Sequence, residues 1–202
     1  MTPATRCLTH TERNGMKPLE RLKVDDPHWL EGGYGDMYVV VGIDPGIVNT
    51  GIVIYFICPQ ERVVIVKHTA IDSYKTEDIL DFLALHLDMS DARPWTYMFV
   101  EAYRPRSHFD TDARMGAAVN EIKKMGPEIY ALDNSGVKNV VSRALLELLH
   151  SWHFTTKSNH QDIRSAARIA ILGMLKNEHL NQLLADIVMT RNTPSAYTFY
   201  AN

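Results

Sequence analysis

Long runs of hydrophobic residues begin at Tyr38, and they are the clearest structural signal in the chain. Tyr38 to Asp44, Thr50 to Ile57 and Glu61 to Ala70 are each rich in Val and Ile, which is typical of buried β-strands. Asp-Pro-Gly and Pro-Gln supply turns between these runs. The pattern therefore predicts a three-stranded meander.

After the meander, hydrophobic residues recur at helical spacing and alternate with short apolar runs, which predicts helices separated by short strands. Thr76, followed by two acids, is the expected N-cap of the first helix. The expected helices are Lys75 to Leu87, Thr111 to Lys124, Gly136 to Trp152 and Asp162 to Leu175, and the expected strands are Tyr97 to Glu101 and Glu128 to Leu132.

Strands followed by alternating helices and strands are typical of an α/β protein. We expect a central mixed five-stranded sheet flanked by helices, formed by residues 37–180. Residues 1–36 lack a hydrophobic period and end in EGGYGD, which predicts an irregular N-terminal arm. Residues 181–202 are expected to form a C-terminal tail.

The composition is that of an ordinary globular protein, with 46% hydrophobic residues, 22% charged residues and a formal net charge of -3 over 202 residues. No apolar run is long enough to span a bilayer, and the polar N-terminus lacks the apolar segment of a signal peptide. Cys7 and Cys58 lie too far apart in the chain to indicate a disulfide framework or a cysteine-rich zinc site. These features favour a cytoplasmic protein whose nucleic-acid-binding surface, if it has one, is local.

Asp44 is an acid at the end of an oily strand, where an unpaired carboxylate is costly. Glu101 ends another expected strand, and Asp162 lies in the first turn of an expected helix. Acids at neighbouring strand ends repel one another, and a divalent cation such as Mg²⁺ removes that repulsion. Taken singly, each acid has a simpler interpretation as a turn aspartate, a rim salt-bridge partner or a first-turn helix acid. Taken together, they predict one metal site.

Several segments resemble the motifs of RuvC-type Holliday-junction resolvases, which have the RNase H-like nuclease fold. GIDPGIVNTG resembles the first motif, FVEAYRP at 99–105 the second, and HQDIRSAARIA at 160–170 the C-terminal one. DARMGAAVNEIKK, at 112–124, is similar to the small-residue helix that follows the second acid in that family. The likeness runs from about Val39 to Lys176.

The resemblance implies a Mg²⁺-dependent endodeoxyribonuclease that acts as a homodimer on branched DNA, the four-way junctions of recombination and repair. Asp44 would be the ligand shared between two metal ions, Glu101 would bind the water-activating side, and Asp162 would complete the site. Mn²⁺ would be able to replace Mg²⁺. The short chain and a departure in the last motif favour a phage or other mobile-element origin.

That departure is Ser165, which stands one helical turn after Asp162, where the family usually has a second metal-site residue. His160, expected just before the helix, is a candidate catalytic residue that would substitute for it or contact the attacking water. The alternative for His160 is a capping or surface histidine.

Basic and aromatic residues near the expected site are candidates for DNA contact, through phosphate binding and stacking on an unpaired base. The alternatives are packing under a loop for the tyrosine and solvated helix-end charges for the cations. The candidates are Tyr103, Arg104, Arg106, Lys138, Lys157 and Arg164.

Other functions stay open. A nuclease of the same fold could act on the RNA strand of a hybrid or on a viral packaging intermediate. Ser165 also permits a catalytically silent protein that binds branched DNA without taking up metal. DPG followed by NTG resembles a phosphate-binding hairpin of the actin and sugar-kinase fold, but that architecture needs two domains and a longer chain. One helix face, formed by Ala113, Gly116, Ala117 and Asn120, permits close approach and could form a dimer seam or pack against the sheet.

Overall fold

The computed structural model describes residues 37–46, 48–72, 75–87, 96–102, 110–124, 129–153 and 160–201. These ranges belong to one compact unit, residues 36–202. The expected N-terminal arm, residues 1–36, lies outside the described residues. Among the described helices, none combines the length and the apolar character needed to cross a membrane.

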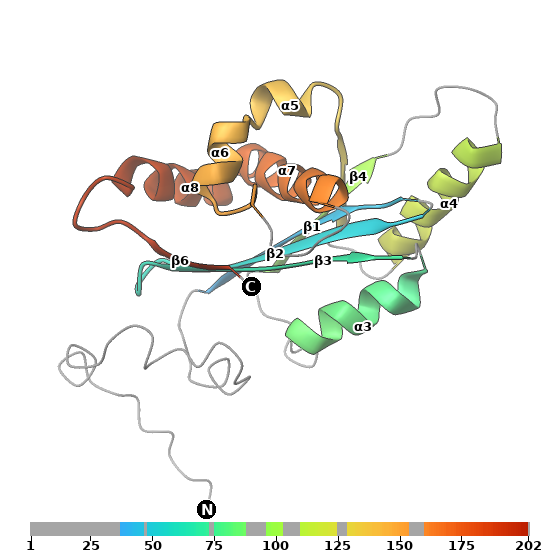
Figure 1. Cartoon of the computed structure of the whole chain (residues 1–202), viewed down its shortest axis with the longest axis horizontal. Helices are drawn as coiled ribbons and strands as arrows, with labels where there is room; N and C mark the ends of the chain where they lie inside the picture. Colours follow the sequence, from blue (N-terminus) through green and yellow to red (C-terminus); the bar gives the residue numbers. More distant parts are fainter. Residues whose placement is uncertain are drawn as a thin grey trace, which may run out of the picture. The chain divides into compact units, whose positions relative to one another are not determined.

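A six-stranded mixed sheet in the order β5-β4-β1-β2-β3-β6 forms the centre of this unit (Figure 1). β2 runs antiparallel to both of its neighbours, whereas β4 is parallel to β1, β5 to β4 and β6 to β3. The strands are β1 (Tyr38–Asp44), β2 (Thr50–Cys58), β3 (Val63–Ile71), β4 (Thr96–Ala102), β5 (Ile129–Asp133) and β6 (Thr198–Ala201).

The expected α/β fold with a mixed sheet between helices is confirmed, but the expected count of five strands is wrong. The additional strand is β6, which comes from the segment expected to be a C-terminal tail. It pairs with β3 over Val63–Val66, and so it covers an edge that would otherwise expose unpaired backbone groups.

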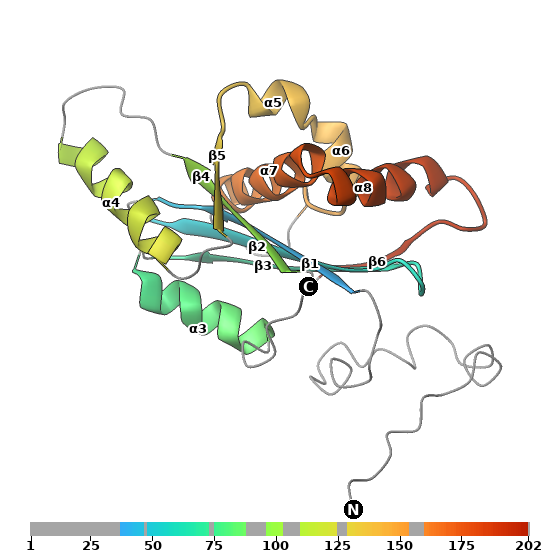
Figure 2. The same ribbon diagram turned by 180° about the vertical axis from the view of Figure 1, so that it is seen from behind.

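The helices cover both faces of the sheet (Figure 1). α7 and α8 lie on one face with α5 and α6 above α7, and α3 and α4 lie on the other face. Figure 2 shows the same layers from behind, with β4 and β5 at the edge of the sheet opposite β6. The helices are α3 (Thr76–His86), α4 (Asp110–Lys124), α5 (Val137–Val140), α6 (Arg143–Leu148), α7 (His160–Lys176) and α8 (Glu178–Thr190).

Some local expectations are wrong in instructive ways. The helix expected over Gly136 to Trp152 is broken at Val141 into α5 and α6, because the Ser142 hydroxyl accepts a hydrogen bond from the Leu145 amide and caps a new helix. α3 has Lys75 rather than Thr76 at its N-cap, without a side-chain capping bond. α7 begins at His160, which was expected to precede the helix.

α7 packs unusually close to the sheet because glycines face it on β1 and β2. A Cβ on Gly42 would lie 2.1 Å from the Ala166 carbonyl oxygen, and a Cβ on Gly51 would lie 2.2 Å from the Asp162 carbonyl oxygen. Real Cβ atoms do not approach backbone so closely, so only glycine fits here. This contact sets the first turn of α7, with Asp162, directly over the end of the β1–β2 hairpin.

Candidate active site

Two of the three predicted acids stand side by side on the sheet. Asp44 ends β1, and Glu101 is the second-last residue of the parallel neighbour β4. Ile43 pairs with Val100 in the register of these strands, so the next residues, Asp44 and Glu101, are neighbours. Successive strand residues alternate between faces, and Asp44 therefore shares with Gly42 the face that α7 covers.

α7 brings the third acid to the same place. Asp162 lies in its first turn, and its negative charge acts on Asp44. Ser165, one helical turn later on the same side of α7, forms a hydrogen bond with the Asp44 carboxyl. The structure thus gathers Asp44, Glu101 and Asp162, which are far apart in the sequence.

The cluster is strongly unfavourable for negative charge at Asp44. Burial, a hydrogen bond with Glu101 and the negative charges of Glu101 and Asp162 raise the pKa of Asp44 from 3.8 to about 9, against the opposing effect of Ser165. Burial also raises the pKa of Asp162, and a hydrogen bond with Asn49 opposes that rise. The Asp44 carboxyl therefore favours its neutral form at neutral pH, and a cation bound beside it would relieve the same repulsion.

Each acid also has a neutral hydrogen-bond partner. The Ser165 hydroxyl bonds to Asp44, the Asn134 amide donates to Glu101 Oε1, and Asn49 bonds to Asp162. Sequence reasoning did not identify these partners and treated Ser165 only as a missing ligand. A signal was present for the asparagines, because Asn49 directly precedes β2 and Asn134 directly follows β5.

The donor set suits a hard divalent cation, because the acids and Ser165 all offer oxygen. Within the described residues, however, no three His, Cys, Asp or Glu side chains surround a common point as metal ligands do. Asp44 and Glu101 are in direct contact, whereas Asp162 acts on Asp44 through its charge. The cluster therefore offers oxygen donors of the kind that divalent cations prefer, and the role of its residues as metal ligands stays a prediction.

Comparisons with known proteins find similar solved structures, two of which are described here. The chain resembles RuvC of T. thermophilus in complex with a Holliday-junction substrate, with 18% identity and a TM-score of 0.46 over 66% of this chain and 90% of that one. It also resembles another Thermus thermophilus RuvC structure, with 16% identity and a TM-score of 0.40 over 75% of this chain and 97% of that one. No protein-family model and no curated protein matches the sequence. These matches give the expected phage origin no support.

The remaining predicted site residues are distributed as follows. Lys138 is exposed on α5, and Arg164 is half-buried on α7. The backbone of His160 opens α7, and its side chain lies outside the described part of the chain. Tyr103, Arg104, Arg106 and Lys157 also lie outside the described residues.

Proposed function

We propose that this protein is a metal-dependent, structure-selective endonuclease that cuts four-way DNA junctions during recombination or repair. The observation that carries the proposal is the gathering of Asp44, Glu101 and Asp162 beneath the first turn of α7. The likeness of GIDPGIVNTG, FVEAYRP and HQDIRSAARIA to RuvC-type motifs supports the choice of reaction and substrate. Mg²⁺ is the proposed cofactor, with Mn²⁺ as a substitute.

Asp44, Glu101 and Asp162 would hold the metal in this proposal. A divalent ion bound there lowers the pKa of a bound water and offsets charge on a phosphodiester, so that no Ser or Cys nucleophile is required. The protein's own contribution is to orient the carboxylates. Asn134 fixes the Glu101 carboxylate through one oxygen, and Ser165 fixes Asp44 in the same way.

The acidic site needs basic surroundings to hold a polyanion. Lys138 and Arg164 are the described candidates for phosphate contact, and Tyr103, Arg104, Arg106 and Lys157 are proposed on sequence grounds. Such contacts position the DNA without reading its sequence. Selectivity for a junction would then come from the shape of the DNA.

The test is cleavage of a synthetic four-way junction in Mg²⁺ by the wild-type protein and by Asp44→Asn. Asp44→Asn is expected to abolish cleavage while junction binding is retained, because the substitution removes a ligand and preserves side-chain volume. Asp81→Asn, at an exposed position on α3, is the matched control and should cleave normally. Cleavage by Asp44→Asn at the wild-type rate would overturn the site, and preference for a hybrid or a linear duplex would overturn the substrate.

Ser165 favours a second candidate, a catalytically silent protein that binds branched DNA. A hydroxyl bonded to Asp44 occupies the position at which the resemblance implies a metal-site residue. Titration calorimetry with Mg²⁺ and Mn²⁺ separates the two candidates. Uptake that is lost in Asp44→Asn supports the nuclease, and absence of uptake by the wild-type protein supports the silent binder.

We also propose that the protein acts as a homodimer in the cytoplasm. A four-way junction has near two-fold symmetry, which a two-fold dimer would match. Gly116 and Ala117 on α4 are accessible, and a Cβ on Gly116 would meet nothing within 4 Å, so this helix face has room for a close partner. Light scattering of the wild-type protein and of Ala117→Arg tests the interface, because a bulky charge there should yield monomers.

A further inference from the structure

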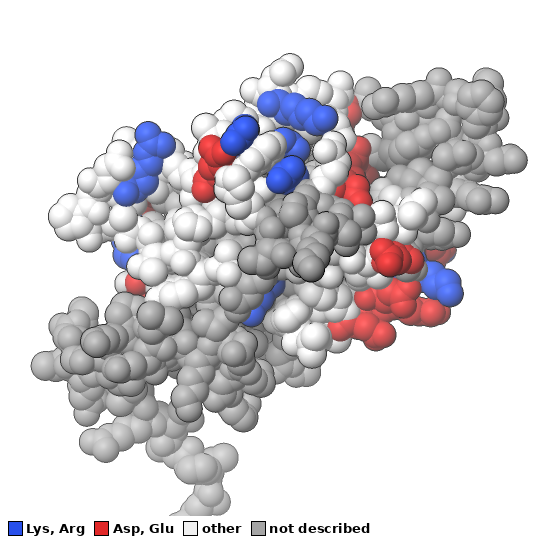
Figure 3. All heavy atoms as spheres, in the orientation of Figure 1, with Lys and Arg blue, Asp and Glu red and all other residues white. Residues whose placement is uncertain are grey.

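Arginines from two helices surround one tryptophan ring on the α7 side of the sheet. The guanidinium carbons of Arg164, Arg143 and Arg168 lie 4.2, 4.9 and 5.9 Å from the centroid of the Trp152 ring. Arg143 belongs to α6, Arg164 and Arg168 belong to α7, and Trp152 lies between these helices in the chain. We call these four residues the Trp152 cluster. Figure 3 shows Lys and Arg side chains gathered over this part of the surface, around α5 and α6.

Positive charge in the Trp152 cluster is only partly compensated. Arg143 Nε donates to Glu147 Oε1 at 2.7 Å, and Arg164 Nε donates to the Trp152 carbonyl oxygen at 2.9 Å. Among the residues that the structure describes, neither Arg164 nor Arg168 has a carboxylate at ion-pair distance. Glu147 is thus the one described carboxylate that pairs with any of the three guanidinium groups.

Within the cluster, Arg168 is the arginine whose burial is energetically most unfavourable. It is only 9% exposed, and its Nε has no hydrogen-bond partner in the described part of the chain. Arg164 stands one helical turn away with the same charge, and burial together with that charge lowers the pKa of Arg168. A buried donor without a partner and two neighbouring like charges are both unfavourable, so packing alone does not account for this arrangement.

We propose that the Trp152 cluster is a binding site for a backbone phosphate of the bound nucleic acid. Guanidinium groups bind phosphate through paired N–H donors, and one phosphate between Arg164 and Arg168 would offset their repulsion. The tryptophan holds the guanidinium planes in place through cation–π contacts. The ring is therefore covered by arginine and is not a platform for base stacking.

The site is distinct from the acid cluster, although both use α7. Arg164 follows Asp162 by two residues, which is about 200° around the helix axis. The phosphate held here would therefore lie on the side of α7 away from the sheet, and a different phosphate would meet the acids. Contact with one phosphate at the Trp152 cluster and another at the acid cluster would fix the direction in which the nucleic-acid strand crosses the acids. The identity of the ligand rests on the proposed function, whereas the anion site itself does not.

The first test measures junction binding in EDTA as a function of salt for the wild-type protein, Arg168→Gln and the control Arg191→Gln, an exposed arginine at the end of α8. Arg168→Gln should weaken binding by about tenfold and lower the slope of log affinity against log salt by about one, because one phosphate contact is lost. Arg191→Gln should change neither quantity. Equal slopes for Arg168→Gln and the wild-type protein would overturn the proposal.

The second test separates this proposal from the proposed function, using the thermal midpoint of the full chain with pyrophosphate as the probe. Pyrophosphate should raise the midpoint of the wild-type protein and of Arg191→Gln, but not that of Arg168→Gln. If Arg168→Gln does not fold, Arg164→Gln replaces it in both tests. If the wild-type protein binds no DNA but keeps an Arg168-dependent pyrophosphate response, the nuclease proposal fails and a free phosphate compound is the ligand. Equal pyrophosphate responses in the wild-type protein and the arginine variants would overturn the anion site.

Discussion

Asp44 links the stability of the fold to its proposed function. The fold half-buries the Asp44 carboxyl beside Glu101, and this burial and the neighbouring acids raise the pKa of Asp44 to about 9. A carboxyl whose pKa is raised by folding favours the native state fully below its ordinary pKa of 3.8, and this contribution is lost as the pH rises toward about 9. The protein is therefore expected to lose stability over that range when chelator is present.

Asp44→Asn should remove this pH dependence, since asparagine carries no charge at any pH. We expect the variant to be more stable than the wild-type protein at pH 7–8 in EDTA, by about 1–3 kcal/mol. Urea unfolding from pH 4 to 8 measures the difference. Asp81→Asn, at an exposed site, should follow the wild-type curve. Parallel curves for Asp44→Asn and the wild-type protein would show that Asp44 is not the group responsible.

Asn134 is a neutral residue that orients the carboxylate of Glu101. Its side-chain amide donates to Glu101 Oε1, which fixes the carboxylate from the β5 side of the sheet. Asn134→Ala is expected to weaken binding of Mn²⁺ by about 10- to 100-fold, the usual effect of removing a partner that orients a metal ligand. Calorimetry measures the affinity. Asn139→Ala, an exposed asparagine in α5, is the control and should bind Mn²⁺ as the wild-type protein does.

At the scale of elements, the contact between α7 and the sheet decides whether the acids meet. Gly51 lies under the first turn of α7, and a Cβ at this position would clash with the backbone of Asp162. Such a Cβ would be fixed to the backbone of β2, and the atoms it would meet belong to the backbone of α7, so neither side can move away as easily as a flexible side chain could. The position of Asp162 relative to Asp44 therefore depends on a glycine that carries no chemistry of its own.

Gly51→Ala should destabilise the fold by about 1–3 kcal/mol, because the added methyl group forces α7 away from β2. Gly116→Ala is the matched control: it lies within α4, and its added Cβ would meet nothing within 4 Å. This control should stabilise the protein by about 0.5–1 kcal/mol through higher helix propensity. Chemical unfolding compares the two variants. A Gly51→Ala protein as stable as Gly116→Ala would contradict the close contact.

Sequence patterns predicted the strands better than the ends of helices. β1 matches the expected Tyr38 to Asp44, because a buried strand appears as an unbroken apolar run between turn residues. The break between α5 and α6 was missed, because the apolar face continues through Val141 while the Ser142 cap redirects the backbone. α8 was not predicted, although its buried residues Leu180, Leu183, Leu184 and Ile187 have helical spacing. It lies beyond the segments that resemble RuvC-type motifs, which end at about Lys176.

In the candidate site, too, some residues could be recognised from the local sequence, whereas others depend on how the elements pack together. The acids could be nominated because charge in an apolar run is conspicuous, and the structure gathers Asp44, Glu101 and Asp162. Their neutral partners could not be nominated, because Asn and Ser are common polar residues whose pairing depends on the register of β4, β5 and α7. The Trp152 cluster likewise joins residues of α6 and α7 that share no local pattern.

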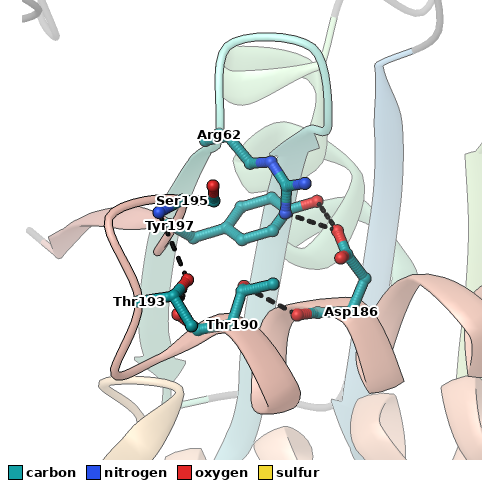
Figure 4. A network of polar contacts seen from close by, with 6 residues as sticks. All are labelled: Arg62, Asp186, Thr190, Thr193, Ser195 and Tyr197. Atoms are coloured by element: carbon teal, nitrogen blue, oxygen red, sulfur yellow. Dashed lines mark hydrogen bonds and ion pairs between the residues drawn. The ribbon is translucent and has the colours of Figure 1, made fainter.

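At the scale of the whole described unit, the C-terminal segment closes the sheet on the side away from the acids. Asp186 on α8 accepts hydrogen bonds from Arg62 in the β2–β3 turn at 2.7 Å and from the Tyr197 hydroxyl at 2.8 Å (Figure 4). The Arg62 guanidinium also lies 5.0 Å from the centroid of the Tyr197 ring. Burial and the charge of Asp186 raise the pKa of Tyr197, so its hydroxyl stays protonated and keeps donating. These contacts join α8, the residue directly before β6 and the β2–β3 turn.

The loop that leads into β6 is ordered by the same network. Thr190 Oγ1 donates to the Asp186 carbonyl oxygen, and Thr193 Oγ1 donates to the Thr190 carbonyl oxygen (Figure 4). The Ser195 amide then donates to Thr193 Oγ1, and the Thr198 amide donates to the Arg62 carbonyl oxygen at the start of β6. β6 is short, so its position depends on these side-chain contacts as well as on its pairing with β3.

Asp186→Ala should therefore destabilise the protein by about 1–2 kcal/mol, because it leaves Arg62 and the Tyr197 hydroxyl without their shared acceptor. Glu121→Ala is the control, since its ion pair with Lys124 is exposed and should contribute little. A double-mutant cycle with Tyr197→Phe should show coupling, because both substitutions remove the same hydrogen bond. Additive effects in that cycle would contradict the network. Junction cleavage should survive Asp186→Ala at permissive temperature, since Asp44 and Glu101 lie on β1 and β4, across the sheet from β6.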